Sequence, residues 1–149
     1  METTSKEISS EIKDILEKNE DASRGYKKAS ENAKSLELKA YFKDKSANRT
    51  RYNREIQQAA ATHFPELKEN ASFSGTVHRA WMDVKALFSA DDDESMLEES
   101  IRGDKAAIKE YNDVINVTTL PVSLRDILIK QRESIQMDLS KNKRLEDLS

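Results

Sequence analysis

The chain has 149 residues and carries 25 Lys and Arg against 28 Asp and Glu, a net charge of −3, with no cysteine. The lack of cysteine excludes disulfides, thiolate catalysis and cysteine metal sites, and the acidic balance argues against a nucleic-acid binder that depends on overall attraction. No apolar run approaches the ~20 residues of a membrane span, and the first residues contain no apolar segment typical of a signal peptide. We therefore expect one soluble, cytoplasmic domain over residues 1–149, with neither a membrane nor a nucleic acid as partner.

The composition indicates a helical protein, because Gly and Pro are scarce while Lys, Glu, Ala, Leu and Ser are abundant. The first helix is predicted over residues 5–34, since Thr4 and Glu7 have the spacing of a capping box. Apolar residues recur along it at steps of three and four, as one face of a helix requires. This stripe consists of Ile8, Ile12, Ile15, Ala22, Tyr26, Ala29 and Ala33.

A second helix is predicted over residues 36–63, and it ends there because Pro65 disfavours a helical residue before it. Its apolar face consists of Leu38, Tyr41, Phe42, Tyr52, Ile56 and Ala59. After a loop, Ser74 is suited to be the N-cap of a short helix over residues 74–89. The apolar side of this short helix consists of Val77, Trp81, Val84 and either Leu87 or Phe88.

Two further long helices follow. The third is predicted over residues 92–116, where an acidic start complements the positive end of the helix dipole. Its apolar stripe consists of Leu97, Ile101, Ile108, Tyr111 and Ile115. The last is predicted over residues 121–147, because Pro121 suits a first helical turn, and its tail is expected to fray after Lys143. Its inward residues are expected to be Leu124, Ile127, Leu128, Ile135 and Leu145.

Four long helices with a short helix in the middle connection predict an all-α four-helix bundle. Short turns make the first two helices antiparallel, and likewise the last two. The connection over residues 64–91 is long enough to return the chain to the other end of the bundle, with the short helix along the outside. This is the ferritin-like arrangement with one long crossover. An up-down-up-down bundle with a capping helix is the competing topology.

A ferritin-like bundle holds two metal ions when two helices each supply a Glu and the other two each supply Glu-x-x-His. The sequence contains no Glu-x-x-His, and its two histidines, His63 and His78, are away from the predicted middle of the bundle. We therefore expect neither a metal centre nor a cofactor.

Polar residues interrupt the apolar stripes at the predicted mid-height of the bundle. They are Asn19, Asp104, Gln131, Asp138 and, in the second helix, Lys45 or Arg49. Because buried charges require partners, we interpret them as a polar layer in which carboxylates meet a cation and amides. The alternative is that helix rotation places Arg49 and Asp138 at the surface, where they are solvated.

The sequence contains two distinctive segments, Gly75-Thr76-Val77-His78-Arg79-Ala80-Trp81-Met82-Asp83-Val84-Lys85 and Leu97-Glu98-Glu99-Ser100-Ile101-Arg102-Gly103-Asp104-Lys105-Ala106-Ala107 with the following Tyr111. Weaker matches are Gly25-Tyr26 with Ala29, and Leu38-Lys39 with Phe42. From about Ile8 to Leu145, the chain resembles a bacterial family of uncharacterised four-helix-bundle proteins in the ferritin-like superfamily. The resemblance implies a ferritin-like fold and indicates little about activity.

The chain departs from the pattern of that family in two places. Many members have a His-Asp pair in the last helix where this chain reads Met137-Asp138, and a Gly-Glu pair where it reads Gly103-Asp104. Both departures weaken the case for a metal site in this chain.

We therefore expect a non-catalytic structural or interaction protein. A homodimer formed by self-association is a further expectation. The alternative is a di-iron or di-manganese bundle with carboxylate ligands, drawn from Glu20, Glu55, Glu98 or Glu99, Asp104 and Asp138. The short crossover helix contains His78, Arg79 and Trp81, which could form a recognition patch. The simpler interpretation is that Trp81 anchors this helix to the bundle, while His78 and Arg79 form hydrogen bonds with nearby groups.

Overall fold

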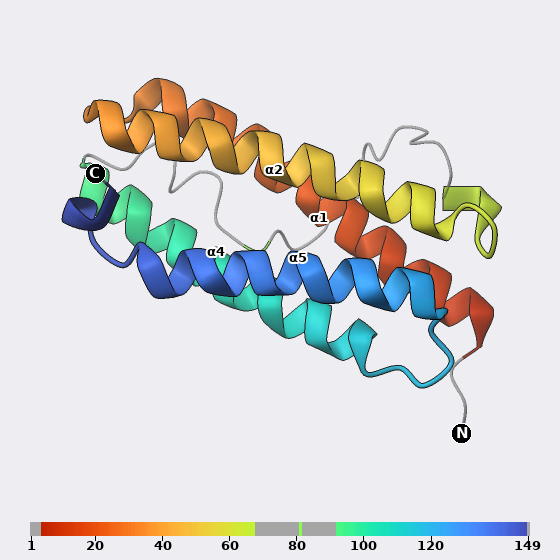
Figure 1. The fold of residues 1–149 in the computed structure, drawn as a ribbon. Coiled ribbons are helices and arrows are strands. Elements are labelled where there is room, and N and C mark those ends of the chain that lie inside the picture. Colours follow the sequence, from red (N-terminus) through yellow and green to blue (C-terminus); the bar gives the residue numbers. More distant parts are fainter. Residues whose placement is uncertain (1–3, 68–80, 82–91, 149) are drawn as a thin grey trace.

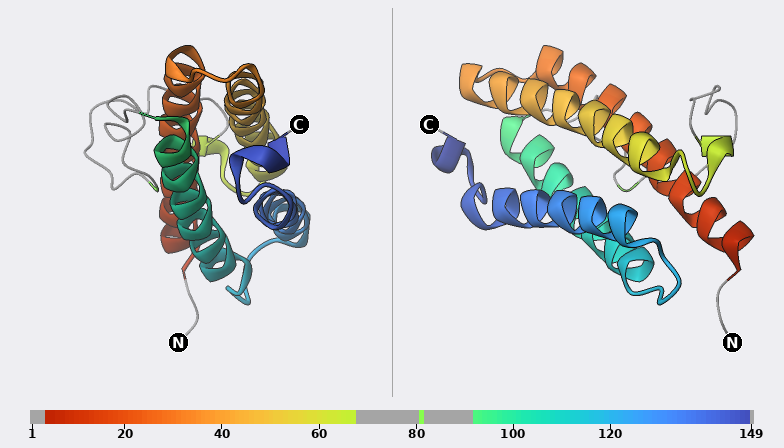
Figure 2. Two further views of the ribbon diagram at one scale, coloured as in Figure 1. Left: turned by 90° about the vertical axis from the view of Figure 1, so that its left-hand side faces the viewer. Right: turned by 45° about the vertical axis from the view of Figure 1, so that its right-hand side comes forward.

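The computed structural model describes residues 4–67, Trp81 and residues 92–148. Four long helices lie at the corners of a bundle (Figures 1 and 2). They are α1 (Ser5–Asn32), α2 (Leu36–Ala60), α4 (Asp93–Ile115) and α5 (Val122–Lys141). No strand occurs in these described ranges. The prediction of an all-α helical bundle is confirmed.

Helices α1 and α2 form a hairpin whose ends are capped by the residues at its turns. Thr4 accepts from the backbone N–H of Glu7, and Glu7 reaches back to Thr4, which is the capping box that their spacing predicts. Ser35 begins α2 by accepting from the N–H of Leu38 at 2.9 Å. These caps satisfy amide groups that would otherwise lack a partner at each helix start.

Contacts between the helix ends fix the direction of each helix. The hydroxyl of Ser9, near the start of α1, donates to Glu66 at 2.7 Å in η1 (Pro65–Leu67), just beyond α2. Asp93, at the start of α4, accepts from the backbone N–H groups of Lys34 and Ser35 at 2.8 Å each. The chain therefore leaves α2 at one end of the bundle and enters α4 at the other (Figure 1).

The other neighbours in the bundle follow from these directions. Helix α4 packs on α1, and α5 returns antiparallel to α4 and packs on α2. The short helix expected over residues 74–89 lies outside the described residues, apart from Trp81.

Two predicted helix ends are wrong. Helix α2 ends at Ala60 and not at residue 63, because the N–H groups of both His63 and Phe64 converge on the carbonyl of Ala60 before Pro65. Helix α5 ends at Lys141 and not at residue 147, since Asn142 leaves helical geometry.

The tail after α5 is folded, which corrects the expectation that it frays. Asp147 accepts from the backbone N–H groups of Lys143 and Arg144, both at 3.1 Å, within the turn that leads into η2 (Leu145–Leu148). This turn leaves Leu145, which was expected to face inward, 36% exposed, and packs Leu148 on the core instead.

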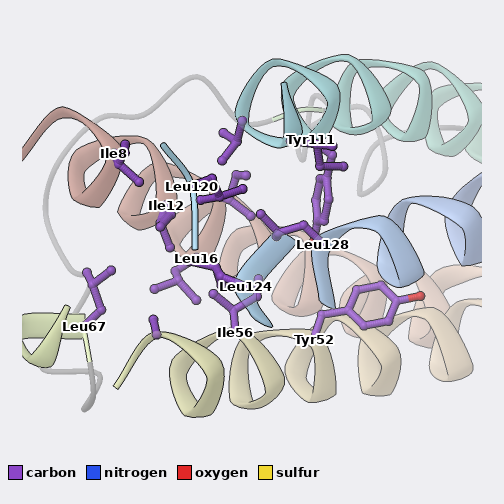
Figure 3. Packing of buried hydrophobic residues seen from close by; sticks show 14 of the residues in the cluster. Ile8, Ile12, Leu16, Tyr52, Ile56, Leu67, Tyr111, Leu120, Leu124 and Leu128 are labelled. Atoms are coloured by element: carbon purple, nitrogen blue, oxygen red, sulfur yellow. The ribbon is translucent and has the colours of Figure 1, made fainter. Parts of the chain in front are cut away.

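The apolar core consists of two clusters at different heights. The larger one fills the end of the bundle that contains the start of α1 (Figure 3). It includes Ile8, Ile12, Ile15, Leu16, Ile56, Leu120, Leu124 and Leu128. The smaller one fills the opposite end and consists of Ala22, Tyr26, Ala29, Ala33, Leu38, Phe42, Met96 and Leu97. Along each long helix, the polar residues discussed below fall between or beside members of these clusters.

A buried polar layer as the candidate functional site

A layer of buried polar side chains lies where the two apolar clusters meet. Asn19 follows Leu16 on α1, Lys45 and Arg49 lie between Phe42 and Tyr52 on α2, and Asp104 precedes Ala107 on α4. The buried members are Asn19, Lys45, Arg49, Asn53, Asp104 and Gln131. Such groups are tolerated in a core only when they are paired.

The carboxylate of Asp104 receives two protein cations. Its Oδ1 accepts from Nη2 of Arg49 at 2.6 Å and from the hydroxyl of Tyr26 at 3.1 Å, and its Oδ2 accepts from Nζ of Lys45 at 2.5 Å. The side chains of Lys45, Arg49 and Asp104 are 7%, 4% and 2% exposed. Charge-assisted hydrogen bonds of this kind are about twice as strong as neutral ones.

Lys45 also links this buried group to a second carboxylate at the edge of the layer. Its Nζ lies 2.8 Å from Oδ2 of Asp138, whose side chain is 23% exposed. Asp138 further accepts from the hydroxyl of Tyr41 at 2.8 Å and from Nδ2 of Asn142 at 2.8 Å. Two cations and two carboxylates therefore form one connected, neutral group.

Aromatic rings face both cations of the layer. Nζ of Lys45 lies 5.0 Å from the ring centre of Tyr26 and 5.1 Å from that of Tyr41. The guanidinium of Arg49 lies 5.8 Å from the ring of Tyr26 and 5.7 Å from the ring of Trp81. The ring faces carry negative partial charge, so they add to the stabilisation of each buried cation.

The protonation states follow from these contacts. Burial alone would lower the pKa of Lys45, but Asp104 and the tyrosines raise that pKa well above its usual value, so Lys45 is charged. Burial alone would raise the pKa of Asp138, but Lys45 and the hydrogen bonds from Asn142 and Tyr41 bring it below its usual value. Burial raises the pKa of Tyr41, which keeps its hydroxyl proton available for Asp138.

Amide side chains complete the layer on the side of the larger cluster. Nδ2 of Asn19 donates to Oδ1 of Asn53 at 3.0 Å and to the hydroxyl of Tyr111 at 3.2 Å. Tyr111 donates in turn to Oε1 of Gln131 at 2.7 Å, and Gln131 donates to Glu55 at 3.0 Å. The bonds among Asn19, Asn53, Tyr111 and Gln131 join all four long helices through neutral groups.

The carboxylates proposed for a di-metal site are not brought together. Glu20 pairs with Arg24, Glu55 accepts from Gln131, and Glu99 pairs with Arg102. Glu98 is exposed, while Asp104 and Asp138 share Lys45. Over residues 4–67, 81 and 92–148, no three His, Cys, Asp or Glu side chains lie close enough together to hold a metal ion.

Of the predicted crossover motif, the structure describes one member. Trp81 is 6% exposed, and its Nε1 donates at 3.0 Å to Glu110, which also receives Lys18 at 2.5 Å. Trp81 is therefore packed against α4, where its ring lies 6.1 Å from that of Tyr111, and beside Arg49 of α2. His78 and Arg79 lie outside the described residues, and His63 is exposed beyond the end of α2.

Sequence reasoning left a choice between Lys45 and Arg49, whereas both side chains meet Asp104. Their spacing of four residues places them on one face of a helix, so the sequence already indicated that both could reach the same partner. Tyr41 was identified as apolar and Asn53 not at all. The contacts of Tyr41 with Asp138, and of Asn53 with Asn19, depend on how the helices are rotated against each other.

The chain belongs to a family described as a domain of unknown function (DUF2383), whose match covers residues 7–117. The matched segment contains α2, α4 and all but the first two residues of α1, and it ends before α5. Searches among curated proteins and among solved structures find no match. Within the described residues, none of the helices is long and apolar enough to cross a membrane.

Proposed function

We propose that this protein is a ferritin-like bundle in which its own cations replace a di-metal centre, and that it acts as a structural or interaction protein and not as an enzyme. The ferritin-like part of the proposal is supported by the helix directions. Helices α1 and α2 run in opposite directions, α4 runs parallel to α2, and α5 returns. Residues 68–91 connect opposite ends of the bundle, as the single long crossover of that arrangement does.

One observation carries the functional part of the proposal, namely the pairing of Asp104 with both Lys45 and Arg49. In a di-metal bundle, inward-facing carboxylates are neutralised by metal ions. Here an ammonium and a guanidinium lie against the inward-facing carboxylate, and a metal ion in the same place would meet two positive charges. At about 4 Å, like charges in a poorly solvated site repel by several kcal/mol.

The layer has a clear structural use. An apolar core tolerates many packings, whereas a buried charge group is stable in only one alignment of the helices. Sliding or rotating α2 against α4 would separate Lys45 and Arg49 from Asp104 and leave buried charges without partners. We therefore assign to the layer the role of fixing how α1, α2, α4 and α5 are aligned, while binding to partners occurs at the surface.

Metal analysis of the purified protein tests this proposal. The chain is produced in cells supplied with iron and with manganese, and metal per chain is measured after gel filtration without chelator. We expect far less than one metal ion per chain, and the same content in the Asp104→Asn variant, because Asp104 is not a ligand. Two iron or manganese ions per chain, lost in Asp104→Asn, would contradict the proposal.

The expected homodimer stays a prediction. Large apolar side chains are exposed at Leu36, Val122 and Met137, which are 78%, 67% and 70% exposed. Light scattering at micromolar concentration checks it: a mass near twice 17.0 kDa supports a dimer, and a mass of 17.0 kDa contradicts it.

A further inference from the structure

A polar groove opens between α2 and α5, beside the buried layer. It has a volume of about 290 Å³. Its lining consists of Tyr41, Asp44, Lys45, Asn48, Arg49, Arg51, Tyr52, Ser134, Asp138 and Asn142. A second hollow of about 350 Å³ shares Arg51, Tyr52 and Ser134 with it, so the two hollows are neighbours along these helices. A depression of this size fits a small molecule.

Arg49 lines this groove, and the described part of the chain uses only a small share of its hydrogen-bonding capacity. Its side chain is 4% exposed. Among the described residues, its one hydrogen bond runs from Nη2 to Asp104. A guanidinium has five N–H donors and cannot lose its charge. A buried guanidinium with spare donors, placed in the wall of a groove, is suited to bind an acceptor from outside the chain.

The unused donors of the Arg49 guanidinium favour an anion as that acceptor. Three cations line it, Lys45, Arg49 and Arg51, against the two carboxylates of Asp44 and Asp138. Asp138 is already committed to Lys45, Tyr41 and Asn142 and is therefore not a competitor for Arg49. Asp104 and Glu55 balance Arg49 and Arg51 from beside the groove, so the attraction for an acceptor comes from the spare N–H donors of Arg49 and not from an excess of positive charge.

Neutral donors lie around the same opening. The amide of Asn48 and the hydroxyl of Ser134 line the groove on opposite helices. Arg51, which is exposed at the rim, lies 3.7 Å from Glu55 and donates to Asn48 at 3.0 Å. Planar oxyanions are bound best where an arginine supplies two parallel N–H groups and nearby neutral donors supply the rest.

We propose that this groove binds a small molecule through an oxyanion, a carboxylate or a phosphate, that is seated on the spare N–H groups of Arg49 and approached by Arg51, Asn48 and Ser134. A divalent cation is disfavoured at the same place by Lys45 and Arg49. The proposal goes beyond the structural role of the layer, and it does not depend on the outcome of the metal analysis.

Titration of the full chain with inorganic phosphate and, separately, with acetate tests this proposal. The Nε–Hε signals of the arginines are followed by NMR at constant ionic strength, with chloride as the reference anion. We expect a saturable shift of the Arg49 signal with at least one oxyanion and none with chloride. The stronger of the two shifts identifies phosphate or carboxylate as the group recognised.

Variants on exposed positions locate the binding without disturbing the buried layer. Ser134→Tyr places a bulky side chain in the groove and is expected to abolish the shift, while Arg51→Gln weakens binding severalfold. Arg54→Gln is the matched control, because Arg54 is an exposed arginine of α2 that does not line the groove. Amide spectra of each variant check that the bundle is intact.

Two results would overturn the proposal. One is the absence of a saturable shift with both oxyanions. The other is a shift of equal size in the wild type and in the correctly folded Ser134→Tyr variant, since that would place the anion outside the groove.

Discussion

The half of the bundle around Ile12 and Leu124 differs from the half around Tyr26 and Phe42 in the kind of side chains that surround its core. In the first half, aliphatic side chains from α1, α2 and α5 pack together (Figure 3). The second half borders Lys45, Arg49 and Asp104, whose charges are held within hydrogen-bond distance of one another.

This contrast shows how one small core combines stability with a unique alignment. Aliphatic burial contributes about 25 cal/mol per Å² and has no preferred direction, so the first half stabilises any arrangement that excludes water. The charge group contributes little net stability when it is complete, but it is costly whenever one member lacks its partner. On our proposal, the first half drives folding, and the charged layer selects the alignment.

The largest expected effect is that of Asp104→Asn. This change leaves Lys45 and Arg49 buried without the carboxylate they share, and breaking a buried pair costs about 3–5 kcal/mol. Urea unfolding followed by circular dichroism measures the loss. The triple variant Lys45→Met, Arg49→Met, Asp104→Leu is the control, because it removes both signs of charge and is expected to retain most of the stability. A triple variant weaker than Asp104→Asn would contradict this account.

A somewhat smaller loss is expected from Leu124→Ala in the aliphatic half. Leu124 is fully buried, and truncation of such a leucine costs about 2–5 kcal/mol through lost transfer energy and a cavity. The loss should be the same in acidic and neutral urea titrations, because Leu124 is packed within a cluster of buried hydrophobic residues. Met137→Ala, at an exposed position of the same helix, is the control and is expected to change the free energy of unfolding by less than about 0.5 kcal/mol. If the loss of unfolding free energy in Leu124→Ala depended on pH, the proposed difference between the aliphatic half and the charged half would be wrong.

The stability that Asp138 provides should depend on pH. Burial alone would raise the folded pKa of its carboxyl group, but Lys45 and the hydrogen-bond donors outweigh burial and bring that pKa below the usual value. A carboxyl with a lowered folded pKa contributes stability that is present above its unfolded pKa of about 3.9 and is lost as the pH falls through the folded value. Thermal melts at descending pH should therefore show a steeper acid decline for the wild type than for Asp138→Asn. Parallel acid declines would show that Asp138 is not coupled to Lys45.

The smallest effect is expected at the acidic seam between α1 and α4. Burial, followed by repulsion from Glu7, Asp113, Asp14 and Glu110, raises the pKa of Glu11. Ionised Glu11 therefore opposes folding at neutral pH, and Glu11→Gln should stabilise the chain by up to about 0.5 kcal/mol, a small value because solvent screens this exposed group. The gain should appear in melts at low salt and vanish at high salt. A salt-independent gain would indicate a cause other than charge repulsion.

The helices were predictable because their apolar residues recur with helical spacing and because caps such as Thr4 with Glu7 are local. The end of α5 was not, since the contacts of Asp147 with Lys143 and Arg144 form a turn that no periodicity encodes. Local turn contacts of this kind mark where a helix with weak capping signals ends.

The composition of the layer was only partly readable from the sequence. Interrupted stripes draw attention to Asn19, Asp104 and Gln131, each of which is buried. They do not reveal that Lys45 bridges Asp104 and Asp138, because that contact depends on the rotation of α2 and α5 about their axes. The helical period gives the face of each residue, whereas its partner across the bundle comes from the packing of the helices.

A double-mutant cycle between Arg49 and Asp104 tests most directly whether the cations of the protein neutralise its buried acid. Free energies of unfolding are measured for the wild type, Arg49→Met, Asp104→Leu and the variant with both changes. If the two groups neutralise each other, the double change costs less than the sum of the single ones, with a coupling of at least about 2 kcal/mol. Costs that add to within about 0.5 kcal/mol would contradict the account.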